Sequence, residues 1–94
     1  MENQVSQEKV EKYFSVTKEA LQEAKNAPHP DEEKTALILD MAERYVADAT
    51  HYYEKGDWVT AFAALNYAHG WLDCGASLGF FTVTNNKLFT VDEE

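Results

Sequence analysis

The architecture of this chain follows mainly from one segment, residues 52–73, with the sequence YYEKGDWVTAFAALNYAHGWLD. Gly56 is predicted to end one helix, because glycine readily adopts the left-handed conformation that closes a helix C-terminus. Asp57 then caps the next helix, since its side chain accepts hydrogen bonds from N–H groups of the first turn. With so short a connection, the two helices are expected to pack antiparallel as a hairpin. Alanines let the second of these helices approach its neighbours closely: Ala61, Ala63, Ala64 and Ala68.

Apolar residues also recur at three- and four-residue steps earlier in the chain, which is typical of amphipathic helices. The first helix ends before Pro28 and Pro30, because proline cannot continue a helix. Asp31 opens the next helix with negative charge, which the positive end of the helix dipole favours. The predicted fold is all-α, an antiparallel three-helix bundle with helices at about 5–27, 31–55 and 57–79.

The third helix is apolar nearly all round, and a helix of this kind is either central in a fold or part of an interface. Two neighbouring helices cannot cover it on every side, so self-association as a homodimer is expected. The candidate interface residues are Tyr67, Trp71, Cys74, Leu78 and Phe81. Glycines at 70, 75 and 79 are interpreted as sites of close packing within this helix.

The C-terminal segment 80–91 has a different pattern, with β-branched and aromatic residues on both sides of Asn85 and Asn86. Asparagine tolerates positive φ, so a two-residue hairpin turn is an expectation here. Such a hairpin would have to lie against the helices or a partner to be stable. The ends, residues 1–4 and 92–94, are expected to fray.

The composition predicts one globular domain over residues 1–94. A chain of 94 residues supports a single core, and 45% of its residues are hydrophobic. Acidic residues outnumber basic ones by 17 to 8, which gives a net charge of −9. No third of the chain is basic, so nucleic-acid binding through phosphate contacts is not expected.

The sequence favours a cytoplasmic location. It begins with neither a basic region nor an apolar stretch, so no secretory signal is expected. No apolar run approaches the roughly 20 residues of a membrane helix. The lone Cys74 can form no internal disulfide and no structural zinc site, which favours a reducing compartment.

Three stretches carry a resemblance to a known family: residues 53–58 (YEKGDW), residues 60–73 (TAFAALNYAHGWLD) and residues 78–81 (LGFF). Here the chain resembles the archaeal family of small helical proteins called domain of unknown function 357, over roughly residues 10–91. The resemblance implies an archaeal cytosolic protein with a helical-bundle fold. It implies no activity, cofactor or catalytic residue, because none is assigned to that family.

One polar group lies on the third helix, where Asn66, His69 and Asp73 share a side at steps of three and four residues. His69 would be a general base oriented by Asp73, or the pair would hold a metal. The alternative is a histidine at the edge of the core that neighbouring groups satisfy by hydrogen bonds. The second reading is favoured, because two ligands do not make a metal site.

A second polar group is Arg44 and His51, seven residues apart and therefore on one helical face. The spacing resembles a ribonuclease motif of other helical domains, but the acidic surroundings repel RNA. Pairing of Arg44 with a nearby carboxylate is the favoured interpretation. The chain is also rich in amphipathic aromatic residues that suit a core, an interface or a ligand groove: Tyr45, Tyr52, Tyr53, Trp58, Tyr67 and Trp71.

The sequence therefore favours a non-enzymatic, homo-oligomeric interaction or adaptor module that uses no cofactor and no metal. Two alternatives remain: a small enzyme or nuclease-like domain, and a binder of an apolar small ligand between helices.

Overall fold

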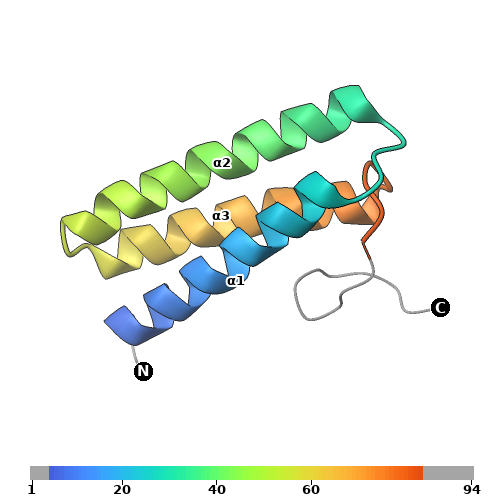
Figure 1. Ribbon diagram of the computed structural model, residues 1–94. Coiled ribbons are helices and arrows are strands. Elements are labelled where there is room, and N and C mark those ends of the chain that lie inside the picture. Colours follow the sequence, from blue (N-terminus) through green and yellow to red (C-terminus); the bar gives the residue numbers. More distant parts are fainter. Residues whose placement is uncertain (1–4, 84–94) are drawn as a thin grey trace.

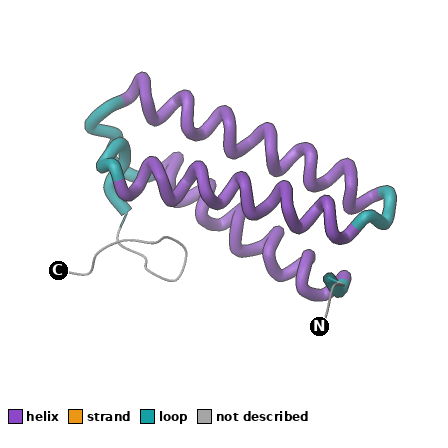
Figure 2. Tube along the Cα trace, turned by 180° about the vertical axis from the view of Figure 1, so that it is seen from behind, coloured by secondary structure: helices purple, strands orange, loops and turns teal. Residues whose placement is uncertain are grey.

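Three helices make up residues 5–83, the part of the chain that the computed structural model describes. They are α1 (Gln7–Asn26), α2 (Glu32–Glu54) and α3 (Trp58–Ser77). In Figure 1, α2 runs back along the molecule from the end of α1, and α3 returns beside it. Figure 2 shows the same three helices from behind, with loops and no strand in the described part. The predicted all-α helical bundle is confirmed.

The first two helices begin at side-chain caps, one or two residues inside the predicted bounds. The hydroxyl oxygen of Ser6 accepts a hydrogen bond from the Lys9 amide at 3.1 Å. Asp31 accepts from the Lys34 amide at 3.1 Å and is the N-cap of α2 rather than its first residue. Each cap satisfies an N–H group that has no partner within the helix.

The corner between α2 and α3 has the geometry that the sequence indicates. Gly56 has a φ of 78°, in the left-handed region. Its amide donates to the Tyr53 carbonyl at 3.0 Å, and the Asp57 amide donates to the Tyr52 carbonyl at 2.9 Å. Asp57 in turn accepts from the Thr60 amide at 3.1 Å. One glycine and one aspartate therefore close α2 and open α3.

The same closing pattern ends α3, where the sequence-based interpretation was wrong about Gly79. This residue lies beyond the helix with a φ of 76°, not inside it. Its amide donates to Ala76 at 3.1 Å, and the Phe80 amide donates to Gly75 at 3.0 Å. Glycine there reverses the chain, and this reversal determines where Phe81 goes.

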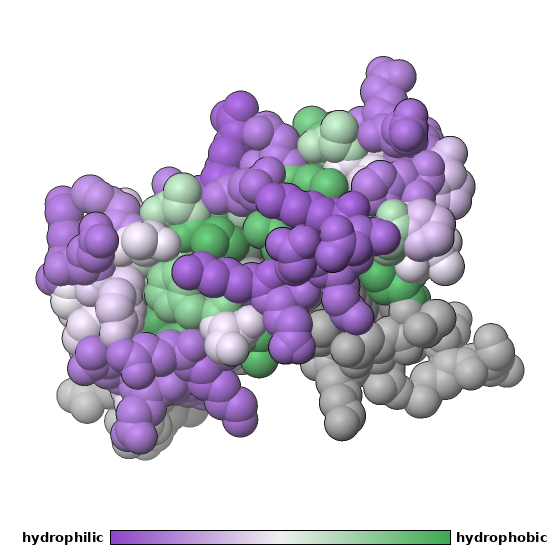
Figure 3. All heavy atoms as spheres, in the orientation of Figure 1, coloured by the Kyte–Doolittle hydropathy of each residue, from purple (hydrophilic) through white to green (hydrophobic). Residues whose placement is uncertain are grey.

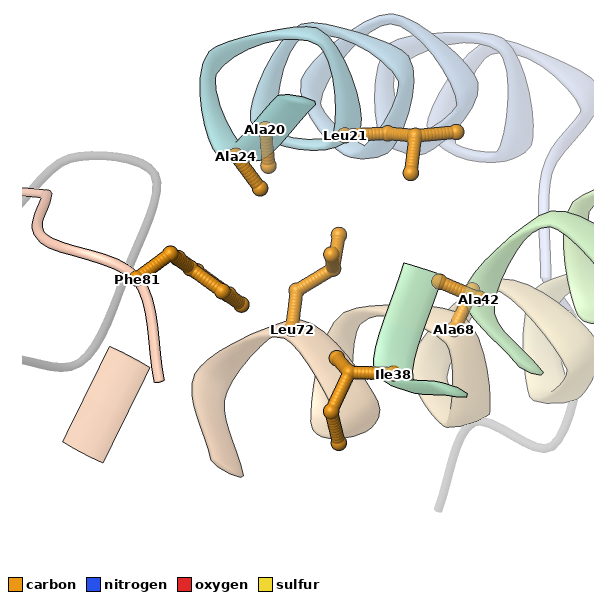
Figure 4. Close-up of a cluster of buried hydrophobic side chains, with 8 residues drawn as sticks. All are labelled: Ala20, Leu21, Ala24, Ile38, Ala42, Ala68, Leu72 and Phe81. Carbon is orange, nitrogen blue, oxygen red and sulfur yellow. The ribbon is translucent and has the colours of Figure 1, made fainter. Parts of the chain in front are cut away.

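Phe81 folds back into the core, so its place among the exposed interface candidates is corrected. Its side chain is 1% exposed. Figure 4 shows it pointing toward Leu72, with the α1 side chains along the top of the cluster. A Cβ at Gly75 would lie 2.5 Å from the Phe81 ring, so the ring occupies space that only glycine leaves open. The full cluster is Ala20, Leu21, Ala24, Ile38, Ala42, Ala68, Leu72 and Phe81.

A second core cluster lies toward the other end of the bundle, where small residues dominate: Val10, Ala49, Ala61, Ala64 and Leu65. Aromatic rings cover its edges, as in the pair Tyr13 and Phe62, whose centroids are 4.8 Å apart. The buried alanines keep α2 and α3 close together. Accordingly, α3 contacts α2 more extensively than it contacts α1.

The segment after α3 joins all three helices at one end. The Thr82 amide donates to the Pro28 carbonyl, in the α1–α2 connection, at 3.0 Å. The hydroxyl of Thr35, which is 1% exposed, donates to the Phe80 carbonyl at 2.7 Å. Residues 80–83 form no strand. The rest of the predicted hairpin and the two ends expected to fray lie outside the described residues.

Candidate interaction surface on α3

The outer side of α3 carries a shallow, open groove of about 580 Å³ whose described lining is almost entirely apolar. The described residues that line it all belong to α3: Ala63, Asn66, Tyr67, Gly70, Trp71 and Cys74. The core contacts of α3 use a different set of positions, including Ala61, Ala68 and Leu72. One helix thus has an apolar inner face that the chain covers and an apolar outer face that residues 5–83 leave open.

Gly70 forms the floor of this groove. A Cβ placed there would meet no atom of residues 5–83 within 4 Å, so this part of the chain leaves open space above the position. Tyr67 forms one wall and is 63% exposed. Its ring is stacked on that of Tyr45 from α2, with centroids 5.2 Å apart and planes 17° apart. The wall is therefore held in position by a second helix.

Exposed leucines extend the apolar surface beyond the groove. Leu78, at the end of α3, is 62% exposed, and Leu37 on α2 is 58% exposed. Both lie at the same end of the α2–α3 pair, because Ile38 packs next to Gly75. Two large apolar side chains are therefore exposed at this end of the helix pair.

Charge is almost absent from α3. Asp73 is the one acidic residue of this helix, which contains no lysine or arginine. The whole chain has a net charge of −9, so its acidic residues are concentrated elsewhere. Figure 3 shows hydrophilic side chains covering much of the visible face, with apolar ones in the seam between α1 and α2, where α3 lies. The described lining of the groove on α3 contains no charged residue, although the molecule as a whole is strongly acidic.

The candidate catalytic group on α3 is not assembled around this groove. Asn66 lines the groove, whereas His69 and Asp73 are half-buried and do not line it. Within residues 5–83, no group of three or more His, Cys, Asp or Glu side chains is placed to hold a metal ion. His69 therefore lies outside the described lining of the groove, and the described residues give it no metal-binding cluster.

Arg44 and His51 lie exposed on α2. Arg44 forms an ion pair with Asp40 at 3.0 Å. The ring of His51 lies against that of Tyr52, with centroids 5.2 Å apart. Both side chains therefore engage neighbours on their own helix rather than lining any groove with each other.

The remaining aromatic candidates pack together at the corner end of the bundle. The Tyr53 ring lies 5.0 Å from that of Trp58 and 5.5 Å from that of Phe14, centroid to centroid. Its hydroxyl donates to the Glu11 carboxylate and accepts from Gln7 at 3.1 Å. The bond to Glu11 raises the pKa of Tyr53, because the carboxylate disfavours loss of the hydroxyl proton. These residues fasten α1 to α2.

The sequence predicted three of the residues that line the groove, Tyr67, Trp71 and Cys74, as interface residues. It did not predict the small residues of the lining. Ala63 and Gly70 were interpreted as positions for close packing, and both are exposed. Their spacing of seven residues, continued by exposed Ser77, was the available signal. Small residues repeated at this interval mark one face of a helix, and this face differs from the buried one.

No helix within the described part of the chain combines the length and the hydropathy needed to cross a membrane. No curated protein and no solved structure matches the chain. One family model matches residues 12–81, which include most of α1 and all of α2 and α3. The match extends to Phe81, the residue that completes the core. The protein therefore belongs to the family described as protein of unknown function, DUF357.

Proposed function

We propose that this protein is a non-enzymatic interaction module that acts as a homo-oligomer, with the outer side of α3 as its interface. One observation carries the proposal: a groove of about 580 Å³ whose described lining is nearly all apolar, on a chain with a net charge of −9. Burying apolar surface stabilises association by roughly 25 cal/mol per Å² before the costs of association are subtracted.

The residues at this surface suit an interface. Tyr67 and Trp71 belong to the residue types that contribute most to binding energy, because they bury large area and lose little side-chain entropy. Stacking on Tyr45 orders Tyr67 before any partner arrives. A rigid wall beside the Gly70 floor reduces the entropic cost of association.

A second copy is the proposed partner, and the charge distribution indicates where two copies can meet. Two molecules with a net charge of −9 repel each other, so contact favours the surface where charge is least. That surface is the outer side of α3. Contact there keeps the acidic side chains of the other helices outside the interface. A protein partner of another kind is the remaining possibility. Nucleic acid and membrane are not proposed partners, and the proposed location is the cytoplasm.

An apolar small ligand is the alternative occupant of the groove. Its position differs from the expectation of a site between helices, because the described lining comes from α3 alone. Such an open surface encloses little of a ligand, whereas pockets for small molecules bury most of theirs. An enzymatic role for His69, Arg44 or His51 is less favoured, since none of the three lines this groove.

The test is the solution mass of wild type and of Tyr67→Glu, measured by light scattering or sedimentation at micromolar concentration. We expect a dimer of the 10.7 kDa chain for wild type, and a monomer for the variant because the new carboxylate would be buried without a partner. Ala47→Glu adds the same charge at an exposed position on α2 and should remain dimeric. A wild-type mass equal to one chain would refute the proposal.

A further inference from the structure

Resting on the proposed self-association, we infer how the two copies meet: their α3 helices cross antiparallel about a two-fold axis at Gly70. Residues equally far from Gly70 on either side then face each other. Asn66 faces Cys74 of the partner subunit, and Ala63 faces the partner's Ser77. Three properties of the groove lead to this arrangement: its centre, its pattern of residue sizes and the position of nearby charge.

The centre of the surface comes first. A two-fold dimer uses the same patch on both subunits, so the axis passes near the middle of that patch. The groove and the leucine beyond it extend from Ala63 to Leu78. Gly70 lies close to the midpoint of this span, and apart from its own helix backbone no described atom lies within 4 Å of where its Cβ would be. It is the position where two helix backbones approach most closely.

The sizes of the side chains favour the antiparallel direction. Large residues pack best when they face small ones across an interface. In a parallel pair each residue faces its own copy, so Tyr67 meets the partner's Tyr67 and Trp71 meets the partner's Trp71. In the antiparallel pair the Tyr67 ring lies beside the turn that contains the partner's Asp73 and Cys74. The bulky walls of one groove then avoid those of the other.

Charge favours the same direction. The first turn of α2 follows Asp31 and contains Glu32 and Glu33. This turn lies at the C-terminal end of α3, because Thr35 bonds to the Phe80 carbonyl at 2.7 Å. A parallel dimer brings two of these acidic turns together, whereas an antiparallel dimer places them at opposite ends. Like charges within about 10 Å repel at moderate salt, so the separation favours the antiparallel form.

A disulfide experiment reports this geometry, because Cys74 is the only cysteine of the chain and is exposed. Asn66→Cys adds a second exposed thiol. In the inferred dimer each new thiol faces the partner's Cys74, so mild oxidation with diamide should convert most of this variant into covalent dimer. Wild type should remain uncross-linked, since its two Cys74 residues are about 12 Å apart along the helix, at 1.5 Å per residue. Disulfides need Cα atoms within about 7 Å.

The matched control is Asn66→Cys combined with Cys74→Ser, whose single thiol pair is equally far apart and should not cross-link. Covalent dimer in wild type under the same oxidation would indicate parallel helices and overturn the inference. A non-covalent dimer in which Asn66→Cys fails to cross-link would overturn it too, while leaving the proposed self-association intact. A monomer before oxidation refutes the proposed function itself, so the two failures are distinguished.

Discussion

The inner and outer faces of α3 each contain a glycine within the helix, and the two glycines have opposite surroundings. At Gly75 a Cβ would lie 2.5 Å from the Phe81 ring and 3.2 Å from Ile38. At Gly70 a Cβ would meet nothing within 4 Å. The chain fills the first space with its own residue, whereas none of residues 5–83 fills the second. The same residue type therefore serves internal packing at one position and an available surface at the other.

This difference shows why an all-round apolar helix is hard to interpret from sequence. The composition of such a helix does not show which of its faces is covered by other residues of the same chain. The answer depends on Gly79, beyond the helix, which turns the chain and sends Phe81 inward. Had the helix continued, Phe81 would have followed the direction of the preceding turns. One residue outside the helix therefore decides what fills the inner face at the C-terminal end of α3.

The largest expected effect comes from removing the side chain that fills the inner face. Phe81→Ala should lower the free energy of unfolding by about 3–5 kcal/mol, because it leaves a cavity beside Gly75 and Leu72. Gly75→Ala should itself cost about 1–3 kcal/mol through crowding against the ring. In the Phe81→Ala background most of that cost should disappear, since the ring is gone and only the 3.2 Å approach to Ile38 remains. Urea unfolding of the two single variants and the double variant measures this coupling.

Gly70→Ala is the matched control for the inner-face substitution. In a monomeric background such as Tyr67→Glu, where no partner approaches Gly70, it should raise stability by up to about 1 kcal/mol, because alanine favours a helix and no described atom lies near its Cβ. Equal losses at Gly70 and Gly75 would contradict the contrast between the two faces. If Phe81→Ala is too unstable to purify, Phe81→Leu provides a smaller cavity for the same cycle.

The next effect separates crowding from backbone strain. Gly56 also has open space around its Cβ position, yet its φ is 78°. Gly56→Val should therefore lower the free energy of unfolding by about 1–2 kcal/mol, because the left-handed conformation is unfavourable for residues with a side chain. Thermal unfolding of Gly56→Val beside Gly70→Ala measures the difference. An unchanged midpoint for Gly56→Val would show that the corner relaxes out of this conformation.

The smallest effect concerns the charge beside that corner. Hydrogen bonds from the side chain and backbone of Thr60 lower the pKa of Asp57 below its usual value of 3.8. A lowered pKa means that the ionised form is favoured in the folded protein. The ionised Asp57 therefore stabilises the folded protein at pH values above the pKa that Asp57 has in the unfolded chain. This stabilisation is lost as the pH falls through the lower pKa that Asp57 has in the folded protein. Asp57→Asn retains a capping oxygen but should lose this pH dependence.

Acid titration of unfolding midpoints compares wild type with Asp57→Asn. Other carboxylates titrate in both proteins, so the informative quantity is the difference between the two curves. That difference should shrink as the solution becomes acidic. A constant difference across the titration would show that ionisation of Asp57 does not stabilise the helix start.

The sequence predicted the helices and the corner because those depend on local signals. Proline, glycine and a capping aspartate act within a few residues, and apolar periodicity acts within one helix. It did not predict the position of Phe81, because that depends on the space left by Gly75 and on a reversal at Gly79. Nor did it distinguish His69, half-buried beside the core, from Asn66, which lines the groove. The position of Phe81 and the different surroundings of His69 and Asn66 both depend on how the helices pack against one another, which local sequence signals do not specify.

The hydrogen bonds that follow α3 have a consequence for how the molecule opens. The Thr82 amide bonds to Pro28 and the Phe80 carbonyl accepts from Thr35, so the last described segment bridges the α1–α2 connection and α2. Separation of α1 at that end requires these contacts to break as well. In deuterated solvent, we therefore expect the Thr82 amide to exchange together with the buried helix amides, despite its position near the surface. Local fraying and global unfolding become the same event at this end of the bundle.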